Sequence, residues 1–115
     1  MPPTPAVDIA DFEANALEVA GILRALGNER RLMILCKLVE AGEMTVGALV
    51  DAVGLSQSAL SQHLARMRDE NILTFRRDSQ TLWYRIKDPR IEQFMAELHR
   101  LFCRGTLPPD TDARS

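Results

Sequence analysis

The sequence predicts a mainly α-helical domain with one small β-hairpin, arranged as a winged helix-turn-helix. Three observations lead to this fold class. Apolar residues recur at helical spacing in five segments, two of these segments are joined by a tight turn at Gly54, and beyond Ile72 apolar and polar residues alternate as in a hairpin. Two helices joined by so short a turn, the second polar on its outer side, form a unit that the major groove of DNA accepts.

The first three helices are expected at residues 11–26, 30–41 and 45–53. Gly27 ends the first helix and Asn28 can cap the second, while Gly42 ends the second and Thr45 can cap the third. Apolar side chains in each helix lie three or four positions apart. Each helix therefore has one face to bury.

The fourth helix, expected at residues 57–69 after an N-cap at Ser56, is the predicted DNA-reading helix. If Leu60, Leu64 and Met67 form its buried stripe, its remaining faces are polar. The candidate DNA-contacting residues on these faces are Gln57, Ser58, Ser61, Gln62 and Arg66. Glutamine can pair with adenine edges and serine with a base or a phosphate, although a helix that only faces solvent shows a similar pattern.

A β-hairpin is expected between Ile72 and Ile86, with residues 76–80 as its polar tip. Arg76, Arg77 and Gln80 in this tip are candidates for contacts with phosphates or with the minor groove. The hairpin is thus predicted to supply the wing of the DNA-binding unit.

The first helix and a last helix, expected from Pro89 to Phe102, are rather apolar for a chain of 115 residues. A homodimer interface built from these two helices would bury their apolar surface, and a two-fold protein matches palindromic DNA. The alternative is that both helices only pack on the small core.

The length and the charge distribution of the chain bear on its domain organisation and on its binding partner. We expect one domain at residues 11–104, between a disordered segment at 1–10 and a flexible tail at 105–115. The net charge is -2, but residues 60–90 hold seven bases and four acids, a net charge of +3. Because charges more than about 10 Å apart are largely screened by salt, this basic segment can bind DNA although the rest of the chain is acidic. The sequence has no apolar run that could span a membrane and no signal peptide, which predicts a cytoplasmic protein.

Three motifs together resemble the ArsR/SmtB family of small bacterial winged-helix repressors. They are the segment Asn28–Leu35, the helix within Leu55–Leu64 and the strand Trp83–Ile86. The resemblance extends over roughly residues 15–103. It implies a homodimer that binds double-stranded operator DNA with an inverted repeat and is released by an inducer.

Many members of that family sense metals, but the corresponding ligands are missing here. Residues 45–51 contain neither Cys nor His, Arg90 stands where a His partner of Asp88 would be, and His99 is alone. We therefore expect no metal site and no other cofactor, which leaves a metal(loid)-sensing repressor as a less favoured alternative. The chain also lacks a Cys-x-x-Cys pair, a Gly-rich phosphate loop and a catalytic triad, so no enzyme activity is expected.

The remaining candidates for a sensor are Cys36 and Cys103, the only two cysteines. A branch of the ArsR family that responds to persulfides carries one cysteine in each of the same two helices. On that resemblance, persulfide or polysulfide would bridge Cys36 and Cys103 within one protomer as a tri- or tetrasulfide. If the sulfurs lie slightly too far apart for a disulfide, each inserted sulfur extends the reach by about 2 Å.

Other interpretations remain open for these residues. Cys36 could be a small core residue, or the pair could respond to general oxidants through a plain disulfide. The protein could also act as an anti-silencing activator, or as a winged helix that binds another protein, although Arg76 and Arg77 speak against the last of these.

Overall fold

The computed structural model of this chain describes residues 9–103, apart from the side chain of Cys103. The predicted disordered segment and tail lie outside the described residues, except that Ile9 and Ala10 begin the first helix. Within residues 9–103 no helix has both the length and the apolar character needed to cross a membrane. The chain divides into two compact units, Met1–Leu32 and Met33–Ser115.

The first unit contains α1 (Ile9–Leu26) and the first turn of α2 (Glu29–Ala41). The Oδ1 atom of Asn28 accepts hydrogen bonds from the backbone N–H groups of Arg30 and Arg31, at 2.9 and 3.1 Å. This contact confirms that Asn28 caps α2. The buried guanidinium of Arg31 donates a hydrogen bond from Nη1 to the carbonyl oxygen of Ala25 at 3.2 Å.

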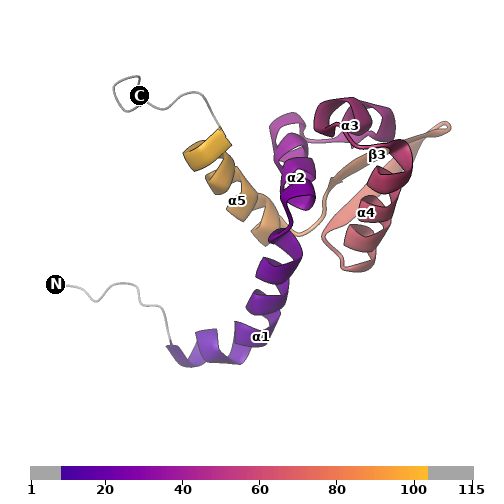
Figure 1. Ribbon diagram of the computed structural model, residues 1–115. Coiled ribbons are helices and arrows are strands. Elements are labelled where there is room, and N and C mark those ends of the chain that lie inside the picture. Colours follow the sequence, from indigo (N-terminus) through magenta and orange to yellow (C-terminus); the bar gives the residue numbers. More distant parts are fainter. Residues whose placement is uncertain (1–8, 104–115) are drawn as a thin grey trace, which may run out of the picture. The chain divides into compact units, whose positions relative to one another are not determined.

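The second unit holds the remainder of α2 and all later elements (Figure 1). In chain order these are β1 (Met44–Thr45), α3 (Val46–Val53), α4 (Gln57–Asp69), β2 (Leu73–Asp78), β3 (Thr81–Ile86), α5 (Pro89–Leu98) and the π-helix η1 (His99–Cys103). The predicted last helix therefore changes from α- to π-geometry at His99. A π-turn is rare and is often found at functional sites.

The turn between α3 and α4 follows the sequence prediction closely. Thr45 caps α3 by accepting a hydrogen bond from the N–H of Ala48, and Gly54 ends that helix with a φ of 73°. Ser56 then caps α4 through the N–H of Ala59 at 3.1 Å. A left-handed glycine followed at once by a serine cap is what allows two helices to be joined by so few residues.

The three strands form one antiparallel sheet in the order β1-β3-β2. Strands β2 and β3 pair from Leu73↔Ile86 to Asp78↔Thr81, and the hairpin projects beyond α4 in Figure 1. The prediction that residues 76–80 form the tip is wrong, because Arg76 and Arg77 lie within β2 and the turn consists of residues 79–80 alone. Strand β1 is not predicted by the sequence, since two residues are too few to show an alternating pattern.

The core of the second unit is mainly aliphatic and contains side chains from both the helices and the sheet. Its fully buried side chains are Ile34, Leu35, Leu38, Leu49, Leu60, Leu64, Met67 and Leu73. The winged helix-turn-helix predicted from the sequence is thereby confirmed.

Candidate DNA-binding surface and cysteine site

The orientation of α4 decides which of its side chains can reach a ligand. Leu60, Leu64 and Met67 are at most 1% exposed, so they form the buried stripe that the sequence predicts. The five predicted DNA-contacting residues of this helix are all exposed: Gln57, Ser58, Ser61, Gln62 and Arg66. The structure thus brings the predicted polar residues onto the outer surface of a helix whose inner face is fixed by packing.

The wing stands next to this helix. The guanidinium of Arg68 in α4 lies 5.2 Å from the ring centre of Phe75 in β2, and that ring lies 5.3 Å from the ring of Tyr84 in β3. Phe75 and Tyr84 are register partners, so one face of the hairpin packs toward α4. The exposed surface of α4 and this face of the wing are therefore neighbours.

The three predicted wing residues have different surroundings. Arg77 is exposed in β2, and Gln80 is exposed in the turn. Arg76 instead binds Glu43, with Nη2 at 2.7 Å from Oε1, and its guanidinium lies 5.4 Å from the ring centre of Trp83. The hydrogen bond from Arg76 holds the pKa of Glu43 below its ordinary value, and the same bond raises the pKa of Arg76. Sequence reasoning missed Glu43, because nothing local links it to a partner 33 residues away.

Cys36 lies in α2 and is buried, with 8% of its surface exposed. One turn later on the same helix, Oε2 of Glu40 lies 3.0 Å from Nε2 of His99. Since His99 begins η1 and Cys103 ends it, the last helix contacts α2 close to both predicted sensor positions. The side chain of Cys103 itself lies outside the described part of the chain.

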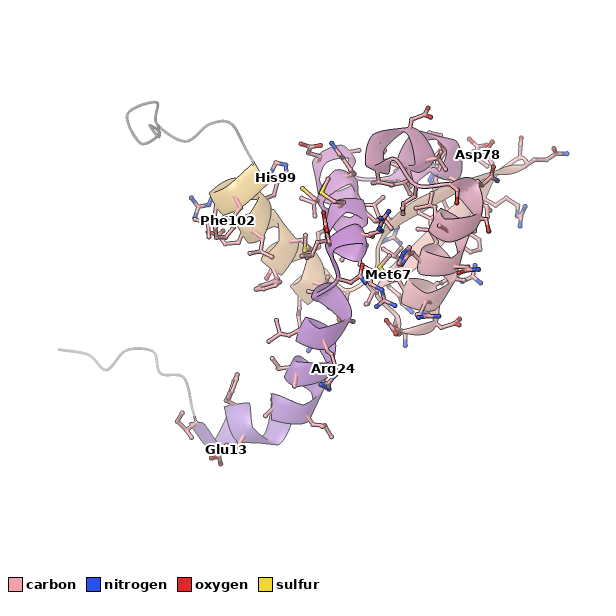
Figure 2. The ribbon with its side chains drawn as sticks, viewed as in Figure 1. Glu13, Arg24, Met67, Asp78, His99 and Phe102 are labelled. Atoms are coloured by element: carbon pink, nitrogen blue, oxygen red, sulfur yellow. The ribbon has the colours of Figure 1, made fainter. Side chains whose placement is uncertain are left out.

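Figure 2 labels His99 and Phe102 at the C-terminal end of the last helix. His99 lies on the side of that helix that faces α2, whereas Phe102 points away and is 77% exposed. The hydrogen bond with His99 lowers the pKa of Glu40; desolvation opposes this effect, and the nearby charge of Lys37 adds to the lowering. The carboxylate of Glu40 is thus the acceptor and the imidazole N–H the donor.

Asp88, whose residue type would suit a metal ligand, serves as the N-cap of α5. Its Oδ1 accepts a hydrogen bond from the N–H of Arg90 at 2.9 Å, and its Oδ2 lies 2.9 Å from Nη2 of the same arginine. These hydrogen bonds lower the pKa of Asp88. In the part of the chain that the structure describes, no three His, Cys, Asp or Glu residues cluster so that they could hold a metal ion.

Comparisons with known proteins agree with this architecture. The family model for bacterial regulatory proteins of the arsR family matches residues 28–74. The transcriptional activator HlyU of Vibrio cholerae is 39% identical over 99 residues, which are 86% of this chain and 91% of HlyU. The chain belongs to the ArsR family. This ArsR-family protein is accordingly a DNA-binding transcriptional regulator, and the relatives it matches are regulators rather than enzymes.

Two further matches extend the comparison, one to a protein named as a repressor and one to a solved structure of HlyU. The biofilm growth-associated repressor of Xylella fastidiosa is 39% identical to this ArsR-family regulator over 93 residues, 81% of each chain. A solved structure described as reduced HlyU from Vibrio cholerae superposes with a TM-score of 0.75 at 40% identity, covering 82% of this chain and 98% of that one. The relatives therefore include one protein named as an activator and one named as a repressor.

Proposed function

We propose that this protein is a dimeric repressor that binds an inverted-repeat operator and is released when persulfide-derived sulfur bridges Cys36 and Cys103. The single observation that carries the proposal is the Glu40–His99 contact of 3.0 Å. Glu40 follows Cys36 by four residues on α2, and Cys103 follows His99 by four residues on the last helix. A residue four positions along a helix lies about one turn away, so both cysteines are close to this contact in sequence.

The chemistry of the bridge balances without a further oxidant. Each cysteine thiolate attacks the outer sulfur of a low-molecular-weight persulfide and becomes a protein persulfide, while a thiol leaves. One protein persulfide then attacks the inner sulfur of the other, which closes a trisulfide and releases hydrogen sulfide. A third persulfide molecule, which lengthens one arm before closure, gives a tetrasulfide by the same steps.

The spacing of the two cysteines can favour persulfides over general oxidants. Cys36 is 8% exposed within an apolar stripe of α2, so burial restricts access for every reagent and does not by itself select among them. A chain of three or four sulfurs also spans a longer gap than a disulfide, by about 2 Å for each sulfur inserted. Selectivity would then come from the spacing of the two helices.

The bridge would act on DNA affinity through the helices that it joins. It ties the last helix to α2, and residues 42–45 connect α2 directly to the sheet that carries the wing. A coupling free energy of roughly 1.4–3 kcal/mol would weaken operator binding by about 10- to 150-fold. Such a regulator would work in the cytoplasm, where the operator DNA is.

The decisive experiment exposes the reduced protein to a persulfide donor and, separately, to peroxide or diamide. Intact mass and operator affinity are measured on the same samples. We expect the persulfide sample to gain one or two sulfurs and lose two hydrogens, and to bind the operator at least tenfold more weakly. Mass change without loss of affinity would contradict the proposal.

Cys36→Ser and Cys103→Ser are the matched variants. Both should bind the operator as well as the reduced wild-type protein and should no longer be released by the persulfide donor. If Cys36→Ser is still released, the cysteine mechanism is wrong. Release of the wild-type protein by diamide to the same extent would instead favour a general thiol-oxidation sensor. A reporter gene under operator control then distinguishes repression from activation.

A further inference from the structure

The wing arginine Arg76 forms an ion pair with Glu43 of the same chain. Its Nε lies 3.2 and 3.1 Å from the two carboxylate oxygens of Glu43, and its Nη2 lies 2.7 Å from Oε1. The guanidinium also stacks over Trp83, 5.4 Å from the ring centre. A guanidinium that is bound by a carboxylate and stacked on an indole is held in one orientation more firmly than an ordinary surface arginine.

Strand geometry separates Arg76 from Arg77. Side chains alternate between the two faces of a strand, and Phe75 lies on the face that packs toward Arg68 of α4. Arg77 is two residues from Phe75 and shares that face, whereas Arg76, whose register partner is Trp83, lies on the opposite face. Only Arg77 is therefore on the side of the wing where the exposed residues of α4 also lie.

Glu43 comes from a segment that is anchored at both ends. Gly42 precedes it with a φ of 86° and donates its N–H to Leu38 at 2.7 Å, which ends α2. Met44 and Thr45 follow it and pair with Tyr84 and Trp83 of β3. The carboxylate is consequently presented to the wing from a backbone whose position is set by a helix end and by the sheet.

We propose that Glu43 is a positioning residue for the wing, which acts by holding Arg76 against Trp83. The pair fixes β2 relative to the segment after α2 and leaves Arg77 as the β2 arginine that contacts DNA phosphate. This proposal rests on the DNA binding of the family and is independent of the cysteine chemistry. In the competing interpretation, Glu43 only restrains free Arg76. Arg76 would then break its ion pair with Glu43 and bind a phosphate when DNA is present.

The salt dependence of DNA binding distinguishes the positioning role of Glu43 from the competing interpretation, in which Arg76 contacts a phosphate. Each phosphate contact contributes about 0.9 to the slope of log affinity against log salt concentration. We expect Arg77→Gln to weaken binding to all sequences and to lower the slope by about 1. Arg76→Gln and Glu43→Gln should each weaken operator binding by about two- to fivefold and leave the slope unchanged, because exposed ion pairs are individually modest. Their double variant should be no weaker than either single one.

A charge-swapped variant, Glu43→Arg with Arg76→Glu, provides the control. It keeps the net charge and an ion pair across the same gap but loses the stack on Trp83, so we expect it to recover part of the lost affinity and to keep the wild-type slope. Three results would overturn the proposal. They are a slope lowered by about 1 in Arg76→Gln, tighter binding with a steeper slope in Glu43→Gln, and wild-type affinity in both single variants. A urea denaturation midpoint for each variant verifies that the fold is intact.

Discussion

At the scale of single residues, the contact between Glu40 and His99 makes stability depend on pH in a defined direction. The hydrogen bond from His99 lowers the pKa of Glu40 in the folded protein. Because the folded pKa lies below the unfolded one, the contribution is complete above the unfolded value, about 4.3 for glutamate, and is lost as the pH falls through the folded pKa. The contact therefore stabilises the protein at neutral pH and not in strong acid.

We accordingly expect Glu40→Gln to lower the urea midpoint at about pH 7 and to have a smaller effect at about pH 3. In a His99→Ala background the donor is missing, so Glu40→Gln should no longer show this pH dependence. An effect of equal size at both pH values, or one that persists in the His99→Ala background, would contradict the assignment. Urea midpoints across the pH range measure both.

Ser79 is a second residue with a local consequence, because it is the first residue of the two-residue turn and has a φ of 58°. A side chain in this region costs about 1–2 kcal/mol, which exceeds the roughly 0.5–1 kcal/mol entropic cost of glycine. Ser79→Gly should therefore stabilise the protein by about 0.5–1 kcal/mol. Gln80→Gly is the control, since Gln80 does not share the positive φ, and it should destabilise. Thermal or urea unfolding would reveal the opposite signs.

At the scale of elements, α4 depends on its N-cap for the position of its first turn. Ser56 accepts the N–H of Ala59, so Ser56→Ala should destabilise the protein by about 1 kcal/mol. Ser58→Ala, two residues along and exposed, should change the stability by less than about 0.5 kcal/mol. Urea denaturation compares the two. Equal losses in both variants would mean that the cap does not stabilise α4 in solution.

The elements also show how far a sequence can predict this fold. The helices and their caps follow from local signals, such as the apolar stripe of α4 and the glycine and serine around Leu55, and these were predicted correctly. The wing was only half predicted, because Arg76 and Arg77 look like turn residues by composition although cross-strand pairing keeps them in β2. Tertiary pairing overrode the local preference there.

Contacts between distant elements could not be predicted in this way. Glu43 and Arg76 are 33 residues apart, and Glu40 and His99 are 59 residues apart. Each is an ordinary surface residue by type, and only the folded chain brings the partners together. The polar face of α4 could be named residue by residue in advance, whereas the orientation of Arg76 away from α4 could not.

For the whole molecule, the distribution of charge matters more than its total. The net charge is -2, yet residues 60–90 carry +3, the difference between seven bases and four acids. This segment contains most of α4 and the entire wing. A regulator with an otherwise acidic surface can therefore bind DNA through one region and repel it elsewhere, which favours a single docking orientation.

The helices at the two ends of the described chain expose large apolar side chains. Phe12 and Leu23 in α1 are each 51% exposed, and Phe94 in α5 is 43% exposed. Large apolar side chains in this number on a small chain indicate surface that a second copy covers. We therefore expect sedimentation equilibrium to give twice the chain mass of 12.9 kDa for the wild-type protein. Phe12→Glu and Phe94→Glu should each shift the protein toward the single-chain mass, because an uncompensated carboxylate is costly to bury.

Thr81→Glu is the control for the added charge, since Thr81 is exposed in the wing, away from both helices. This variant should keep the mass of the dimer. Operator binding supplies a second measurement, because a monomer contacts one half-site at a time and loses the affinity that comes from linking two half-sites. If Phe12→Glu and Phe94→Glu remain dimeric, the interface lies elsewhere. If the wild-type protein is monomeric but binds an inverted repeat cooperatively, the dimer forms only on DNA.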